Sequence, residues 1–104
     1  MLKQLDIRLG RLRVKKVKKK KQISVTQEDI ATGKRNETQS CPVWLACRRA
    51  LPYGDLSVGA NDLYFDGAMT ELPLPVRKWI ERFDRSGAES VKPFRFTLRL
   101  SWMP

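Results

Sequence analysis

The sequence of 104 residues contains no histidine, only two cysteines and no long apolar run. Without histidine, the chain lacks the side chain that most often acts as a general base near neutral pH. We therefore expect no enzyme activity and no cofactor. No run approaches the 18 or so apolar residues of a membrane-spanning helix, and the N-terminus lacks the apolar core of a secretory signal. We expect no membrane partner and a cytoplasmic location.

The two cysteines, Cys41 and Cys47, predict free thiols. They fall on one predicted helix, six residues apart, which separates them by about 9 Å along its axis and is too far for a disulfide. A thiol at a helix start can act as a nucleophile, but no histidine and no suitably spaced carboxylate could activate Cys41. We interpret both as buried small residues in a reducing compartment. Two cysteines without histidine also cannot complete a tetrahedral zinc site, so we expect no metal.

Positive charge is concentrated at the N-terminus. The chain carries a net charge of +10, of which residues 1–21 supply +9 with ten Lys or Arg and one Asp, while residues 22–104 supply +1. This division predicts a basic N-terminal arm over 1–21 and a single domain over 22–104. We expect the arm to be mobile when free, or to form a strand that pairs only through its apolar half.

Lysine and arginine at this density can replace condensed counterions on a phosphate backbone. The arm therefore predicts non-specific nucleic-acid contact. The alternative is a solvated tail, or leader sequence upstream of the natural start. The candidate nucleic-acid-binding residues are Arg11, Arg13, Lys15, Lys16, Lys18, Lys19, Lys20 and Lys21.

Apolar and polar residues alternate near the C-terminus, as in a strand with one buried and one solvated face. We interpret this stretch as the central strand of the domain. Its apolar residues are Phe94, Phe96, Leu98, Leu100 and Trp102. Its polar residues are Arg95, Thr97, Arg99 and Ser101.

Three further strands and three helices are expected. Strands are predicted at 23–25, 55–58 and 62–65, the last closed by a turn at 66–67. Thr26 and Ser40 are predicted helix N-caps, and a third helix buries one side, formed by Val76, Trp79, Ile80 and Phe83. The order β-α-α-β-β-α-β predicts a small α+β domain with one four-stranded, mostly antiparallel sheet and the two main helices on one of its faces.

The helix after Ser40 presents a candidate partner-binding face. Its small residues form the buried stripe, which leaves Trp44, Arg48 and Arg49 outside, and these are residue types that dominate binding hot spots. The alternative is that Trp44 packs against Tyr53 or the 72–75 segment, with both arginines solvated. The acidic residues near the strand at 62–65, Asp62, Asp66 and Glu71, are interpreted as turn and cap residues.

Four blocks of sequence carry a resemblance. VTQEDIATG (25–33), SCPVWLA (40–46), LPVRKWIERFD (74–84) and PFRFTL (93–98) are similar to signature blocks of small uncharacterised bacteriophage and prophage proteins. The resemblance covers about residues 23–100 and transfers no activity and no site residue. It implies a phage-type accessory or host-takeover protein in the host cytoplasm, a class that includes anti-CRISPR proteins.

Three functions are compatible with a nearly neutral domain and a basic arm. The first is a non-enzymatic protein that binds and inhibits or modulates a host or defence complex through Trp44, Arg48 and Arg49. The second is a small nucleic-acid-binding or ribonucleoprotein component that uses the arm. The third is a virion structural protein.

Overall fold

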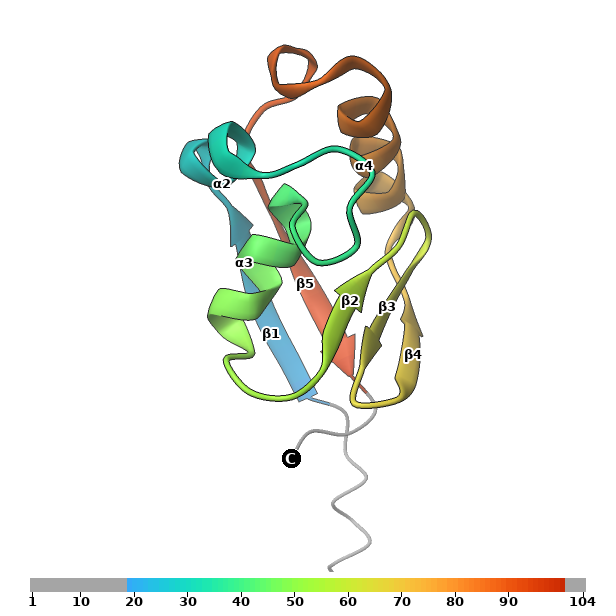
Figure 1. The fold of residues 1–104 in the computed structure, drawn as a ribbon. Coiled ribbons are helices and arrows are strands. Elements are labelled where there is room, and N and C mark those ends of the chain that lie inside the picture. Colours follow the sequence, from blue (N-terminus) through green and yellow to red (C-terminus); the bar gives the residue numbers. More distant parts are fainter. Residues whose placement is uncertain (1–18, 101–104) are drawn as a thin grey trace, which may run out of the picture.

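The computed structural model of the protein describes residues 19–100, and within them five strands form two antiparallel sheets (Figure 1). The first sheet, the β1–β5 ribbon, pairs β1 (Lys19–Val25) with β5 (Phe94–Leu100). The second is a meander of β2 (Leu56–Val58), β3 (Asp62–Phe65) and β4 (Ala68–Glu71). The class is α+β as predicted, but the single four-stranded sheet is wrong.

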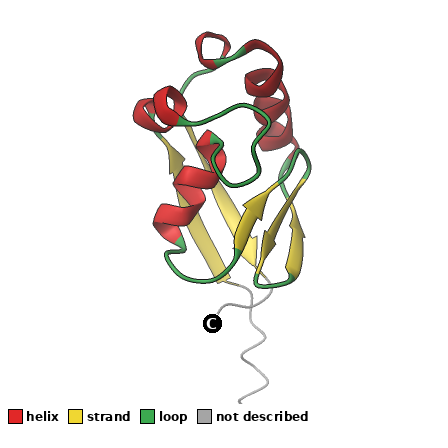
Figure 2. Ribbon diagram, viewed as in Figure 1, coloured by secondary structure: helices red, strands yellow, loops and turns green. Residues whose placement is uncertain are grey.

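Three α-helices and a short 3-10 helix accompany these strands in the described chain. They are α2 (Gln27–Thr32), α3 (Pro42–Ala50), α4 (Leu74–Ser86) and η1 (Ala88–Ser90). α3 packs against both β1 and β2 and so links the two sheets. Figure 2 shows the other helices gathered at one end of the strands. The predicted arrangement of two helices on one face of one sheet is therefore also wrong.

The strand missed by the prediction is β4, which follows a tight turn. Asp66 and Gly67 both adopt positive φ, at 50° and 86°, as a two-residue hairpin turn of type I′ requires. The residues after the turn, Ala-Met-Thr-Glu, have little of the β-branched and aromatic character that marks strands. The turn itself was visible in the sequence, but the strand it begins was not.

The two sheets and the helices share one core. α4 buries Val76, Ile80 and Phe83 as its spacing predicts, and Trp79 packs against the same cluster. The inner residues of both sheets complete it, and the fully or almost fully buried ones include Ile23, Val25, Leu56, Leu63 and Leu98. No described helix has the length and apolar character to cross a membrane.

The start of α3 differs from expectation. The N-cap of α3 is Cys41 rather than Ser40, and its sulfur accepts a hydrogen bond from the Trp44 amide at 3.4 Å. On α4, the Arg77 guanidinium lies 3.6 Å from the Glu71 carboxylate at the end of β4. Glu81 and Arg85, four residues apart on the same helix, form an ion pair at 3.7 Å.

Candidate functional site

The outward side of the β1–β5 ribbon is basic. Because side chains alternate along a strand, the register places Lys20 opposite Arg99, Gln22 opposite Thr97 and Ser24 opposite Arg95 on one side of the ribbon. All of these are exposed except Thr97, which is half-buried. The apolar partners, such as Ile23 and Phe96, point to the other side and into the core. We call these six outward residues the basic face.

The three cations of the basic face have no partner among the described residues. No carboxylate of residues 19–100 forms an ion pair with Lys20, Arg95 or Arg99; the ion pairs of the described chain are those of Arg49 with Asp29, Arg77 with Glu71 and Arg85 with Glu81. The face itself carries no Asp or Glu. Its other side chains are neutral, and the Thr97 hydroxyl donates to the Gln22 amide oxygen at 3.3 Å. The face therefore presents unneutralised positive charge.

One cross-strand pair on this face is unfavourable for folding. Lys20 and Arg99 are direct register partners, and like charges directly opposite each other destabilise an antiparallel pair. Arg95 lies four residues from Arg99 on the same strand, about 13 Å away at 3.3 to 3.4 Å per residue. Three cations spread over such a length match an extended chain of negative charges better than a single small anion.

Only part of the predicted nucleic-acid-binding set lies in the described chain. β1 begins at Lys19, so the predicted boundary between residues 21 and 22 falls inside a strand. Of the last lysines, Lys20 belongs to the basic face, while Lys21 is half-buried on the opposite side as the register partner of Leu98. Lys19 is the first residue of β1 and the register partner of Leu100. The remaining five candidates lie outside the described residues: Arg11, Arg13, Lys15, Lys16 and Lys18.

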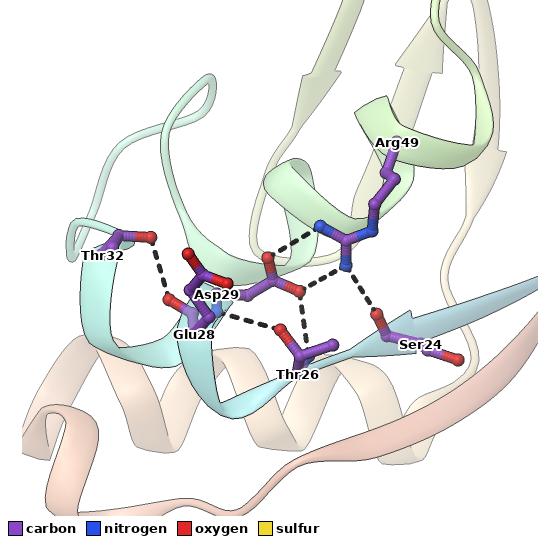
Figure 3. A network of polar contacts seen from close by, with 6 residues as sticks. All are labelled: Ser24, Thr26, Glu28, Asp29, Thr32 and Arg49. Atoms are coloured by element: carbon purple, nitrogen blue, oxygen red, sulfur yellow. Dashed lines mark hydrogen bonds and ion pairs between the residues drawn. The ribbon is translucent and has the colours of Figure 1, made fainter.

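Arg49, predicted to contact a partner, holds elements of its own fold together (Figure 3). Its guanidinium donates to both carboxylate oxygens of Asp29, at 3.1 and 2.7 Å, and to the backbone oxygen of Ser24 at 3.0 Å. Asp29 also closes a capping box with Thr26 at the start of α2. Burial raises the pKa of the Asp29 carboxyl, but the hydrogen bonds from Arg49 and Thr26 outweigh this and leave the pKa below its ordinary value. The network joins β1, α2 and α3.

Trp44 and Arg48, the other two predicted partner-binding residues, anchor the loop that follows α3. The Trp44 indole donates to the Leu56 oxygen at 2.8 Å, and the Arg48 guanidinium lies 5.4 Å from the centre of the indole ring. Arg48 also donates to the oxygens of Leu51 and Gly54, at 3.0 and 2.6 Å. The structure thus brings Trp44 and Arg48 together, while Arg49 points to a different network.

The thiols are buried on α3. Burial raises the pKa of Cys41 despite the amide hydrogen bonds at the helix start, and it raises the pKa of Cys47 to about 12. Both therefore remain protonated at neutral pH, which makes them weak nucleophiles. Within residues 19–100, no three side chains of types that bind metals come together in a group that could hold an ion.

Of the three acidic residues interpreted as turn and cap residues, only Asp66 lies in a turn, whereas Asp62 and Glu71 lie at strand ends. Asp66 lies in the turn before β4, and its carboxylate accepts from the Asp55 amide at 2.8 Å. Asp62 and Glu71 are register partners at the start of β3 and the end of β4. They are spread along the meander, and Glu71 is paired with Arg77.

Sequence reasoning placed Arg95 and Arg99 on a solvated strand face but did not identify them as a site. The sequence did contain a signal for this site, because the alternation from residue 94 already placed Arg95 and Arg99 on one side of the strand. The missing information was the pairing of β1 with β5, which adds Lys20 to the same side and leaves all three cations without a counter-ion. Comparison of the chain with models of protein families, with curated proteins and with solved structures finds no match.

Proposed function

We propose that the protein binds nucleic acid through the phosphate backbone, with the basic face as its site. The observation that carries this proposal is the set of three cations without counter-ions, Lys20, Arg95 and Arg99, two of which face each other at a cost to folding. Charge that is unfavourable for the isolated fold is explained if an anion neutralises it in the complex. The basic residues of the arm precede β1 directly in the chain and would add further phosphate contacts.

The expected affinity is electrostatic and independent of base sequence. Each phosphate neutralised releases condensed counterions, so the logarithm of the binding constant falls with the logarithm of salt concentration by about 0.7 to 0.9 per contact. The three cations of the face should therefore account for a slope of about 2 to 3. Removing them should lower affinity and flatten the salt dependence together.

The test is a salt titration of a labelled 20-nucleotide DNA, read by fluorescence anisotropy, with the full-length chain. The variant Lys20→Gln/Arg95→Gln/Arg99→Gln should reduce the slope by about 2 to 3 and weaken binding at 0.1 M salt by roughly 100-fold. The matched control neutralises three exposed cations away from the ribbon, Lys34→Gln/Lys78→Gln/Arg82→Gln. This control has the same net charge as the first triple variant, and its affinity and salt dependence should fall much less.

Two results would overturn the proposal. If both triple variants weaken binding equally, only total charge matters and the basic face is not the site. If the wild-type chain does not bind at all, nucleic acid is not its ligand. Deleting residues 1–18 measures the contribution of the arm separately, and it spares β1, which a deletion to residue 21 would shorten.

We propose a second function, binding to a host or defence protein complex, because of one exposed aromatic residue. Tyr53 is 83% exposed, and it lies on the loop whose ends Arg48 holds through the oxygens of Leu51 and Gly54. A large aromatic side chain on a loop already fixed in place loses little entropy on binding, and tyrosine is enriched in hot spots. In this version of the hypothesis, Trp44 and Arg48 position the loop and Tyr53 makes the contact.

A pull-down from nuclease-treated host lysate separates this function from the first. A protein retained in stoichiometric amount by the wild type and lost with Tyr53→Ala supports it, since removing an exposed side chain should leave folding intact. Tyr64→Ala on the outer side of the meander is the control, because Tyr64 is also exposed. A partner retained equally by both variants would remove Tyr53 from consideration.

A further inference from the structure

The basic face leads into an open groove at the end of the ribbon farthest from Lys19. The groove has a volume of about 460 Å³ and lies where β1 ends and β5 begins. Arg95 belongs both to the basic face and to the wall of this groove. The remaining lining residues are Ser24, Val25, Thr26, Gln27, Pro93 and Phe94.

The lining includes an aromatic residue and polar residues. Phe94 is half-buried, and its ring lies 4.9 Å from Trp79 and 5.7 Å from Phe96 between centroids, so its position is set by aromatic packing. The exposed Gln27 also lines the groove, and its side chain makes no hydrogen bond with any residue of 19–100, which leaves its amide oxygen and NH2 group available. A flat group with hydrogen-bonding edges matches these two side chains.

We infer that this groove takes one unstacked base of a single-stranded nucleic acid whose phosphates lie on the basic face. The inference rests on the proposed function. Single strands are recognised by aromatic contact with splayed bases, by hydrogen bonds to their edges and by basic residues along the backbone, and here Phe94, Gln27 and Arg95 offer one of each within one groove. A duplex keeps its bases stacked inside and cannot supply one without unpairing.

The volume and position of the groove agree with this occupant. Small-molecule sites usually enclose about 300 to 1,000 Å³, so the space is adequate for a group of this kind. Arg95 at the rim would hold the phosphate next to the bound base. Arg99 and Lys20, further along the ribbon, would hold the backbone that leads toward the N-terminal arm. The protein would therefore prefer single strands over duplexes without reading a long sequence.

The experiment compares three ligands of equal length and charge per strand, using the full-length chain. They are a 12-residue oligothymidylate, the same chain with abasic sites in place of its bases, and a 12-base-pair duplex. Base contacts in single-strand sites are worth enough that the oligothymidylate should bind roughly fivefold or more tightly than the abasic chain. Gln27→Ala should reduce this ratio, and Phe94→Leu should bring it close to one.

Gln39→Ala is the matched control. It removes the same kind of amide from an exposed position outside both the basic face and the groove, and should leave the ratio between oligothymidylate and abasic chain unchanged. Phe94→Leu alters aromatic packing and is used only if its urea midpoint shows a folded protein. If it does not fold, the comparison of Gln27→Ala with Gln39→Ala tests the groove by itself.

The outcomes separate the inference from the function on which it rests. A base-dependent preference that Gln27→Ala weakens and Gln39→Ala does not supports binding of a base in the groove. If oligothymidylate and abasic chain bind equally, and binding still depends on salt and on the basic face, the inference that the groove binds a base is wrong but nucleic-acid binding stands. Tighter binding of the duplex also contradicts the inference. If none of the three ligands binds, both the inference and the proposed function are wrong.

Discussion

The two sheets of this small domain differ in charge and in the way the chain builds them. The β1–β5 ribbon has an outward face of cations and neutral side chains, and it joins strands from opposite ends of the described chain. The meander β2–β3–β4 is built from neighbouring strands. Between Arg49 and Arg77 the sequence has no Lys or Arg, and its four acidic residues are Asp55, Asp62, Asp66 and Glu71.

This comparison shows how a nearly neutral domain can still have a basic surface. A net charge of +1 for residues 22–104 suggested that only the arm would attract a polyanion. Lys20, Arg95 and Arg99 lie on the ribbon, whereas the segment that contains the meander carries four acidic residues and no cation between Arg49 and Arg77. Such a separation orients the approach of a charged partner. The meander would point away from a nucleic acid that the ribbon binds.

Truncating a buried side chain of the β1–β5 ribbon should have the largest effect on stability. Ile23 is completely buried on β1, and truncating a buried isoleucine to alanine costs about 2 to 5 kcal/mol. Ile23→Ala should therefore lower the free energy of unfolding by that amount in urea titrations. Gln22→Ala, its exposed neighbour, should stay within about 0.5 kcal/mol of wild type. Similar values for the two variants would contradict the assignment of faces to β1.

Removing the ion pair that joins α2 to α3 should reduce stability by less. In Asp29→Asn, the charge-assisted hydrogen bonds from Arg49 are weakened, and we expect a loss of about 1 to 3 kcal/mol at pH 7. Because the pKa of Asp29 is lower in the folded state than its ordinary value of 3.8, its contribution is complete well above pH 3.8 and disappears as the pH falls through the folded pKa.

Urea unfolding of wild type and Asp29→Asn at several pH values checks this directly. The difference in free energy between them should be constant from pH 7 to about pH 5 and should shrink below pH 3.8. Glu28→Gln, at an exposed neighbouring carboxylate, serves as the control and should show little difference. A gap between wild type and Asp29→Asn that widens toward low pH would refute the direction of the shift.

The smallest change in stability should have the opposite sign. Lys20→Glu replaces a like-charge pair with a cross-strand ion pair to Arg99, so the variant should be more stable by a few tenths of a kcal/mol and by no more than about 1 kcal/mol. The same change should weaken nucleic-acid binding by more than about tenfold at 0.1 M salt. Thermal melts and anisotropy titrations measure the two effects.

A gain in stability accompanied by a loss of binding would mark Lys20 as a residue kept for function. Lys34→Glu, at an exposed lysine outside the ribbon, controls for net charge. If Lys20→Glu instead destabilises the protein, the like-charge pair is not the unfavourable contact that the register indicates, and the main support for the proposed function is lost.

Much of the local structure could be predicted from the sequence. The alternation over residues 94–100 and the apolar spacing of Val76, Ile80 and Phe83 were confirmed, because they depend only on the repeat of a strand or a helix; Ser101 and Trp102 lie outside the described residues. Thr26 was also confirmed as the N-cap of α2, since a capping box is closed within four residues. The turn at 66–67 was confirmed for the same reason.

Elements that depend on distant neighbours were predicted less well. The start of β1 was set four residues too late, because a run of lysines does not resemble a strand until its pairing with β5 is known. The edge strand β4 lacked a clear pattern. The partner of Arg49 could not be found from spacing, since Asp29 lies 20 residues away on another helix.

The sequence by itself therefore determined the class of the domain, most of its elements and the outward direction of Arg95 and Arg99. These follow from contacts between residues close in the chain, whose geometry repeats with a fixed period. Only the tertiary structure decided that β1 pairs with β5, that Lys20 stands opposite Arg99 and that a groove opens beside Arg95. Strand pairing over such a distance is selected by burial of the shared core, which no local pattern records.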